Sequence, residues 1–189
     1  ELGGPLSASL GPDATVTDVA STKGAIVARA DHAGLRFVGG HPMAGLETPG
    51  FAAAREDLFV GRPWVVCRGA GAGEPDLARV AWLVQACGAV AHELDPATHD
   101  RLVAAISHLP LVASAALVEA VTAGPDWPAA AGLAAGGWRS MTRLAAGDPT
   151  MAAGIAATNP VEIAAGLRAL RATLDEWLAA LEPPGPDAG

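Results

Sequence analysis

The stretch Phe37-Val-Gly-Gly-His-Pro-Met-Ala-Gly-Leu-Glu-Thr-Pro-Gly50 has the features of a strand that ends in a ligand-binding loop. A short apolar run leads into Gly39-Gly40, and His41 stands directly before Pro42. The ring of Pro42 favours an extended backbone at His41, and the glycines allow tight turns or the close approach of a ligand. Open α/β sheets bind their ligands at such strand ends. We therefore predict that His41 lies on a stiffened loop beside a cleft. The alternative is a surface histidine in a turn.

The composition is that of a globular chain with no nucleic-acid-binding surface. Its 189 residues are 51% hydrophobic and 17% charged, which excludes the disordered class. A net charge of −8 with only 12 lysines and arginines argues against phosphate-backbone binding. Cys67 and Cys87 are too few for a disulfide scaffold, so we expect free thiols and a cytoplasmic protein.

The sequence predicts no contact with a membrane. The start of the chain shows no signal-peptide pattern. The longest run without a formal charge, Leu102–Val118, contains His108 and Pro110 and is short for a membrane span. We expect it to form a buried helix.

The first half of the chain alternates between strand and helix patterns. Strands are predicted at 14–19, 35–38, 62–67 and 89–94, and helices at 23–33, 51–58 and 75–86. The residues expected to face inward are Ile26, Val27 and Ala30 in the first of these helices and Leu77, Val80, Ala81 and Val84 in the last. This alternation predicts a mostly parallel sheet with helical crossovers. Ser21 or Thr22 is expected to cap the helix at 23–33, and Gly88 to end the helix at 75–86 in a left-handed conformation.

No strand pattern returns after Asp95-Pro96. Helices are predicted at 98–123 with a kink at Pro110, within 127–146, and from Asp148-Pro149 onward. A last helix starts at Asn159-Pro-Val-Glu162, with Asn159 as its cap, and carries a leucine stripe that suits either an internal core or a dimer. We therefore divide the chain into an α/β part at 1–95, an all-α part at 96–182 and a flexible tail at 183–189.

Several familiar motifs are absent or incomplete. Gly69-Ala-Gly71-Ala-Gly73 has Glu74 where a dinucleotide fingerprint would continue, and we expect it to be a loose surface connection. His92, His99 and His108 lack metal-ligand spacing, so we predict no metal site. Ser107 and His108 are adjacent on a helix and point about 100° apart, and no nucleophile elbow exists, which argues against a hydrolase.

Four separated segments together resemble the prephenate and arogenate dehydrogenases of tyrosine biosynthesis. They are Asp18-Val-Ala-Ser-Thr-Lys23, Gly39-Gly-His-Pro-Met-Ala-Gly45, Ser107-His-Leu-Pro110 and Gly136-Gly-Trp-Arg-Ser-Met-Thr-Arg143, in this order. The resemblance runs from about Asp18 to about Leu181. It implies the C-terminal part of a Rossmann-type parallel-sheet domain, without the Gly-rich N-terminal half, followed by a helical dimerisation domain that makes a homodimer.

The resemblance implies the oxidative decarboxylation of prephenate to 4-hydroxyphenylpyruvate, with hydride transfer to NAD or NADP. His41 would be the base that accepts the hydroxyl proton, and Ser21 would orient it or contact the nicotinamide. Arg143 would bind a substrate carboxylate. Further implied contacts are Ser107, His108, Arg139 and Glu47 to the substrate, and Asp18, Ala20, Ser21 and Lys23 to the cofactor.

The residues leave alternatives open. Ser21 could be a plain helix cap, Arg139 a surface residue and His108 a core histidine. Leu111 stands where some prephenate-using relatives carry a second histidine, and Ala152 where a tryptophan is frequent, so arogenate is an alternative substrate. Two further hypotheses are a non-catalytic dimerisation and binding module, because the fingerprint is missing, and a different hydroxyacid dehydrogenase of the same design.

Overall fold

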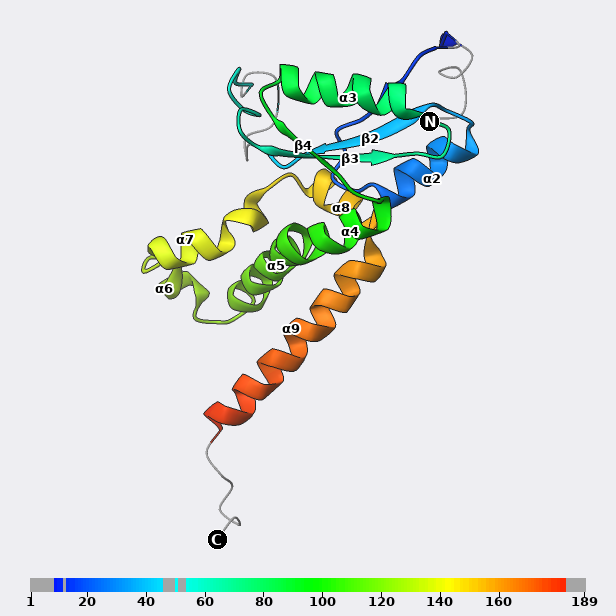
Figure 1. The fold of residues 1–189 in the computed structure, drawn as a ribbon. Coiled ribbons are helices and arrows are strands. Elements are labelled where there is room, and N and C mark those ends of the chain that lie inside the picture. The colour runs from blue at the N-terminus through cyan, green and yellow to red at the C-terminus, as the bar shows by residue number, and fades with distance from the viewer. Residues whose placement is uncertain (1–8, 12, 46–49, 51–53, 183–189) are drawn as a thin grey trace.

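A computed structural model describes residues 9–11, 13–45, 50 and 54–182, and it consists of a sheet-bearing part followed by helices (Figure 1). Within these residues the sheet has four strands in the order β1-β2-β3-β4. Their bounds are β1 Val16–Thr17, β2 Phe37–Pro42, β3 Pro63–Arg68 and β4 Val90–Glu93. β1 is parallel to β2 and β3 is parallel to β4, which confirms the mostly parallel sheet. The central pair, β2 with β3, is antiparallel.

The connection between β2 and β3 differs from the prediction. Residues 54–58 form a loop and the start of a turn instead of the helix predicted at 51–58, whose first three residues lie outside the described part. An antiparallel neighbour needs no helical crossover, so a loop suffices between these two strands.

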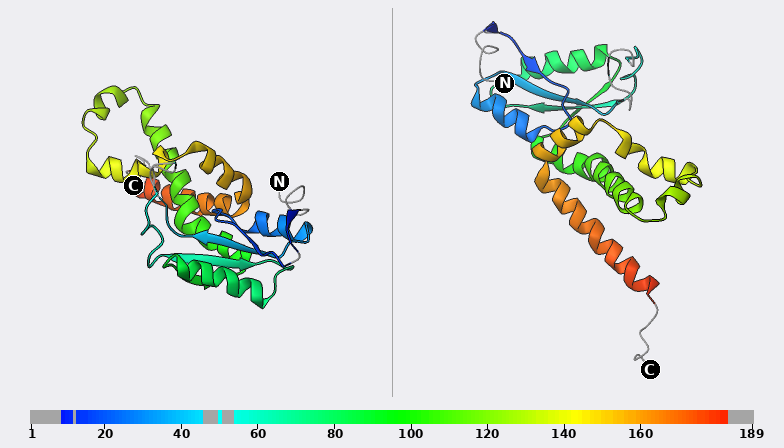
Figure 2. Two further views of the ribbon diagram at one scale, coloured as in Figure 1. Left: turned by 90° about the horizontal axis from the view of Figure 1, so that it is seen from above. Right: turned by 180° about the vertical axis from the view of Figure 1, so that it is seen from behind.

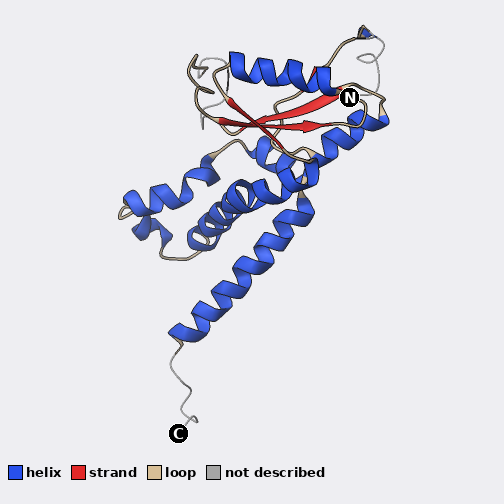
Figure 3. Ribbon diagram, viewed as in Figure 1, coloured by secondary structure: helices blue, strands red, loops and turns tan. Residues whose placement is uncertain are grey.

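Two helices cover opposite faces of the sheet, α2 (Gly24–His32) and α3 (Glu74–Ala86) (Figures 1 and 3). Successive side chains of a strand point to opposite faces, and the core divides accordingly. One cluster contains Val27, Ala30, Leu35, Phe37, Val65 and Cys67. The other contains Val38, Trp64, Val66, Val80, Val84 and Ala89. The inward faces predicted for both helices are confirmed.

A long helical run follows the sheet: α4 (Pro96–Val103), a π-helical turn η2 (Ala104–His108) and α5 (Leu109–Thr122). The Leu109 N–H donates to the carbonyl of Ala104, five residues back. The turn lies just before Pro110, whose ring lacks an N–H and crowds the preceding turn. The irregularity predicted at Pro110 therefore takes the form of a widened turn.

The remaining helices are α6 (Trp127–Ala131), α7 (Gly136–Thr142), the 3-10 turn η3 (Arg143–Ala146), α8 (Pro149–Thr158) and α9 (Pro160–Leu181). α9 starts beside α4 and projects away from the sheet as a long arm (Figures 1 and 2). Ile163, in its first turn, is buried, whereas Leu174 and Leu178 are more than half exposed.

The prediction of a buried helix at 102–118 is wrong for the single chain. The run Pro96–Thr122 is long and apolar enough to cross a membrane by length and composition, and only 22% of its most apolar window is buried. Core helices of soluble proteins share this length and composition, but they are mostly buried. Leu102 and Ile106 are exposed, whereas His99 and His108 on the same run are fully buried. These two histidines therefore face the rest of the protein.

Two predictions about glycines have different outcomes. Gly88 has φ +74°, which confirms the left-handed end of α3. The segment from Gly69 to Gly73 lies at the surface as predicted, but its backbone is not loose, because it packs closely at Gly69 and Gly71. A Cβ at Gly69 would lie 2.7 Å from Asp31 Oδ1, and one at Gly71 would lie 2.5 Å from the Leu35 carbonyl oxygen.

Candidate functional site

His41 is part of β2, paired with Val65 of β3, and not on a loop after the strand as predicted. Pairing with β3 extends the strand through Pro42, which the apolar pattern alone does not indicate. His41 is 8% exposed. The preceding Gly40 lets β2 lie close to the end of β1, because a Cβ there would be 2.5 Å from the Asp18 carbonyl oxygen.

A buried ion pair joins the segment after β1 to this part of β2. Lys23 is fully buried, and its Nζ donates to Asp18 Oδ2 at 2.5 Å and to the Gly40 carbonyl at 2.8 Å. Asp18 also accepts from the backbone N–H groups of Gly40 and Ala20. Burial lowers the pKa of Lys23, and Asp18 opposes that shift. The polar atoms of Asp18 and Lys23 thus point into the protein, whereas Ala20 and Ser21 are half-exposed on the loop that the pair shapes.

The ring of His41 contacts a residue that the sequence analysis did not assign to the site. His41 Nδ1 lies 2.8 Å from His99 Nε2, and His99 Nδ1 lies 2.8 Å from Asp100 Oδ1. The Asp100 carboxylate also accepts from the backbone N–H groups of Lys23 (2.7 Å) and Gly24 (2.8 Å). It therefore caps α2, and the prediction that Ser21 or Thr22 caps this helix is wrong. The signal in the sequence was a His-Asp pair in the first turn of a helix, which becomes informative only once its distant partners are known.

His41 is held in its neutral form. Its pKa is lowered to about 3, first by burial and then by the nearby His99, Lys23 and His108, with Asp100 acting in the opposite direction. A neutral imidazole can accept a proton at neutral pH, which a charged one cannot.

His108 and Asn159 form a second buried contact beside the first. The Asn159 side-chain amide donates to the Asp100 carbonyl at 2.9 Å and lies 3.3 Å from His108 Nδ1. Asn159 occupies the predicted N-cap position of α9, but its side chain makes no capping hydrogen bond there. Burial lowers the pKa of His108, and the nearby Asp100 and the backbone of Ser21 oppose that shift. Ser107 is half-buried on the same π-helical turn.

The two predicted arginines lie on a different part of the helical region. Arg139 is exposed on α7, and Arg143 is exposed at the start of η3. Buried Ser114 of α5 fixes this segment, because its hydroxyl donates to the Met141 carbonyl at 2.9 Å and accepts from the Ala145 N–H at 3.1 Å. Glu47 lies outside the described residues.

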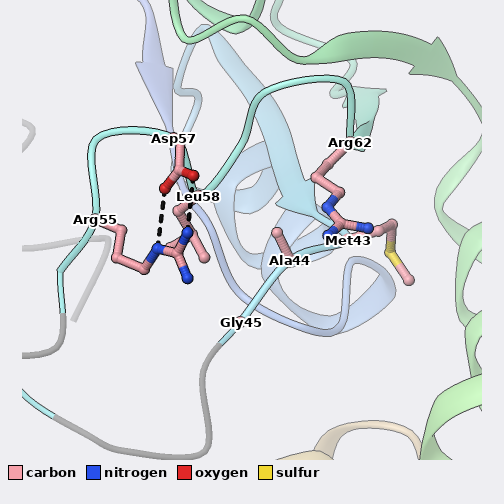
Figure 4. A pocket seen from close by; sticks show the side chains of 7 residues that line it. All are labelled: Met43, Ala44, Gly45, Arg55, Asp57, Leu58 and Arg62. Atoms are coloured by element: carbon pink, nitrogen blue, oxygen red, sulfur yellow. Dashed lines mark hydrogen bonds and ion pairs between the residues drawn. The ribbon is translucent and has the colours of Figure 1, made fainter.

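Two cavities adjoin these elements. One, of about 330 Å³, lies where the chain leaves β2 (Figure 4). It is lined by Met43, Ala44, Gly45, Arg55, Asp57, Leu58 and Arg62. The other, of about 370 Å³, is apolar and lies between α5, η3 and α8. Its lining includes Leu111 and Ala152, so the two departures from the family pattern share one cavity, next to the segment that carries Arg143.

The residues at the end of β1 fit the nicotinamide end of a dinucleotide better than its phosphates. Ala20 and Ser21 form a half-exposed, uncharged segment with one hydroxyl. Four of the five backbone N–H groups of the Gly69–Gly73 turn, those of Gly69, Ala70, Ala72 and Gly73, are engaged within the protein, so the turn offers no phosphate cradle. Among the described residues, no cluster of three or more histidine, cysteine or acidic side chains could hold a metal ion.

Two family models match the chain side by side. "Prephenate dehydrogenase, nucleotide-binding domain" matches residues 5–93, and "Prephenate dehydrogenase, dimerization domain" matches residues 95–184. The prephenate dehydrogenase of Bacillus subtilis (strain 168) is 36% identical over 140 residues, which are 72% of this chain and 38% of that protein. The chain thus spans about two fifths of the length of this relative.

Solved structures of the same kind superpose on most of the chain. The arogenate dehydrogenase of Synechocystis is 35% identical, with a TM-score of 0.79 over 93% of this chain and 64% of its own. The prephenate dehydrogenase of A. aeolicus, in complex with hydroxyphenyl propionate and NAD⁺, is 30% identical, with a TM-score of 0.81 over 90% of this chain and 60% of its own.

Proposed function

The chain belongs to the prephenate dehydrogenase family, and we propose that its site serves the oxidative decarboxylation of prephenate to 4-hydroxyphenylpyruvate with NAD or NADP. The observation that carries the proposal is the buried, neutral imidazole of His41 near the end of β2, close to His108, which in turn lies at the backbone of half-exposed Ser21. A proton acceptor in this neighbourhood supports the proposal, because the uncharged segment Ala20-Ser21 suits a nicotinamide. The dinucleotide supplies the chemistry that the side chains lack, because it accepts a hydride.

In this proposal His41 moves a proton twice. It accepts the substrate hydroxyl proton while hydride leaves the same carbon, which makes a ring ketone. The ring carboxylate then departs as carbon dioxide, and its bonding electrons enter the ring, which becomes aromatic as the ketone oxygen turns into a phenolate. His41 returns its proton to that oxygen. Aromatisation supplies much of the driving force, so the protein mainly positions the groups and holds the proton.

The substrate carboxylates need cations, and arginine binds carboxylates with two parallel hydrogen bonds. We propose Arg143 for this contact, assisted by Arg139 one helical turn earlier. Ser107 and His108 would line the pocket on the side of the π-helical turn. Ser21 would contact the hydroxyl or the nicotinamide.

Arogenate is the alternative substrate. The apolar cavity lined by Leu111 and Ala152 supports it, because the chain has neither a second histidine nor a bulky tryptophan there. A comparison of prephenate, arogenate and simple hydroxyacids as substrates of the full natural chain tests the assignment. A preference for a simple hydroxyacid would replace it with another dehydrogenase activity.

The substitution His41→Asn tests the proposed base. In the full natural chain we expect turnover to fall by roughly 10²–10⁴-fold, the usual contribution of general acid–base catalysis, with substrate binding largely intact. His92→Asn, on an exposed position of β4, is the matched control and should retain wild-type turnover. Turnover near the wild-type level in His41→Asn would contradict the proposal.

A second candidate function is a non-catalytic dimerisation and binding module in the 189 residues themselves. It is favoured by the missing dinucleotide fingerprint and by the engaged N–H groups of the Gly69–Gly73 turn. Titration of NADH against this chain decides between the two, because tight binding would refute the module. We also propose a homodimer formed through the helices and a cytoplasmic location, which suits the free and buried thiol of Cys67.

A further inference from the structure

A chain of hydrogen bonds connects the proposed base to a carboxylate on another element. It runs from His41 on β2 to His99 and then to Asp100, both on α4, with 2.8 Å between ring nitrogens and 2.8 Å from ring to carboxylate. His99 is fully buried, and the other two residues are less than a tenth exposed. Because the three side chains are buried, which group donates in each hydrogen bond depends on the protonation of the three side chains.

The carboxylate fixes that direction. Asp100 receives two backbone N–H groups, those of Lys23 and Gly24, and these hydrogen bonds favour its ionised form. An ionised carboxylate only accepts, so the proton between Asp100 and His99 belongs to His99 Nδ1. A neutral imidazole with its proton on Nδ1 has a lone pair on Nε2. The proton between the two rings therefore belongs to His41 Nδ1, and His41 Nε2 is bare.

We propose that His99, held by Asp100, is a positioning residue that fixes His41 in the Nδ1–H tautomer and so makes His41 Nε2 the proton acceptor. The proposal rests on the proposed function for the role of His41 as base. Beyond the proposed function, it specifies which nitrogen of His41 accepts the proton and which residues determine that choice. Since α4 follows the sheet in the chain, the base is oriented by the docking of the helical part onto the sheet.

The charged and titratable groups around the two rings are Asp100 on α4, Lys23 at the start of α2 and His108 on η2. At the His41 ring, Asp100 favours a positive charge, whereas His99, Lys23 and His108 oppose it.

Long-range ¹H–¹⁵N correlation spectra of the 189-residue chain measure the tautomer directly and need no substrate. At neutral pH we expect His41 to carry its proton on Nδ1, with Nε2 bare. In His99→Leu the acceptor is gone, and we expect the Nε2–H form of His41 to appear. A wild-type His41 protonated on Nε2 would overturn the proposal, whether or not the chain belongs to an active dehydrogenase.

Kinetics of the full natural chain provide the second readout. We expect His99→Leu to lower kcat by about 100-fold, with KM within about threefold, because binding does not require the correct tautomer. His99→Gln keeps an oxygen that can accept from His41 Nδ1, and we expect it to restore kcat to within about tenfold of wild type. His92→Leu is the control and should behave as wild type.

The outcomes separate this proposal from the proposed function. A kcat of His99→Leu within about threefold of wild type would overturn the positioning role while leaving His41 as the base. If the full natural chain has no dehydrogenase activity but the spectra show His41 protonated on Nδ1, the proposed function is overturned. The hydrogen bonds from His41 through His99 to Asp100 would then still stand. If His99→Leu does not fold, the tautomer of His41 in the wild-type chain and the kcat of His99→Gln still test the positioning role of His99.

Discussion

At the scale of single residues, Gly40 sets how closely β1 and β2 approach beside His41. A Cβ at this position would lie 2.5 Å from the Asp18 carbonyl oxygen and 2.9 Å from Trp64 Nε1. We expect Gly40→Ala to destabilise the chain by about 1–3 kcal/mol, because buried backbone must move to admit the methyl group. Urea unfolding measures the change.

The matched control for Gly40→Ala is Gly45→Ala, three residues after the end of the strand. A Cβ at Gly45 meets nothing within 4 Å, and the backbone there is not left-handed. We expect its stability to stay within about 0.5 kcal/mol of wild type. A similar loss in both variants would show that strand spacing does not depend on Gly40.

The sequence allowed the prediction of His41 but not of its environment. A histidine between two glycines and a proline is unusual enough to be noticed. Its neighbour His99 is 58 residues away in the chain, and nothing within one helix indicates that its ring meets a strand. Ser114, which anchors the segment around Arg143, was missed for the same reason. Contacts of this kind depend on how elements dock, and no local pattern encodes docking.

At the scale of elements, Asn159 stands at the cap position of a helix, but its side chain connects two other elements. It has the sequence of a cap, yet its amide joins α4 to η2. Serine caps helices as well as asparagine does but is too short to make both contacts. We therefore expect Asn159→Ser to destabilise the chain by about 1–3 kcal/mol, as measured by thermal or urea unfolding.

Asp148→Ser provides the comparison, because Asp148 is exposed and its side chain accepts from Thr150 in an ordinary local cap. We expect a change of no more than about 0.5 kcal/mol. Equal effects of the two substitutions would mean that the bridging contacts of Asn159 contribute little.

Helix faces were predictable from sequence, but several helix ends were not. Periodic apolar residues located the buried sides of α2 and α3, since burial follows the helical repeat directly. The cap of α2 comes from Asp100, 77 residues beyond Lys23. The extension of β2 through Pro42 likewise depends on its antiparallel partner β3. Local sequence patterns include only nearby residues, whereas these two ends are determined by tertiary contacts with residues distant in the chain.

At the scale of the whole molecule, the outer half of α9 has an uncovered apolar stripe of Leu174, Trp177, Leu178 and Leu181. An apolar patch of this kind is typical of a protein interface. We expect the wild-type chain to sediment as a dimer and the double variant Leu174→Glu with Leu178→Glu as a monomer.

The control for this prediction is Ala172→Glu with Ala179→Glu, which adds the same charge on the opposite side of α9. We expect this variant to remain dimeric. Dissociation of both double variants would indicate that charge on α9, not loss of its apolar stripe, disrupts the assembly.

The stability of the molecule should fall as pH decreases below 6.5. The folded chain lowers the pKa of His41 from 6.5 to about 3, so in that window the unfolded chain binds a proton that the folded chain does not. Stability from this group is present above pH 6.5 and is lost as pH falls toward 3. Between pH 7 and pH 5 the loss is about 2 kcal/mol.

Urea unfolding of wild type and His41→Gln at both pH values measures this contribution. The variant should lose about 2 kcal/mol less than wild type on going from pH 7 to pH 5. Equal losses in the two proteins would show that burial of His41 does not govern the acid response.

The cap that Asp100 places on α2 also sets an order of events during folding. The amides of Lys23 and Gly24 gain their acceptor only when Asp100, which lies 77 and 76 positions further along the chain, reaches them. Pulse-labelling hydrogen exchange during refolding should therefore find these two amides among the last in α2 to be protected. They would record the moment at which the two parts of the chain join.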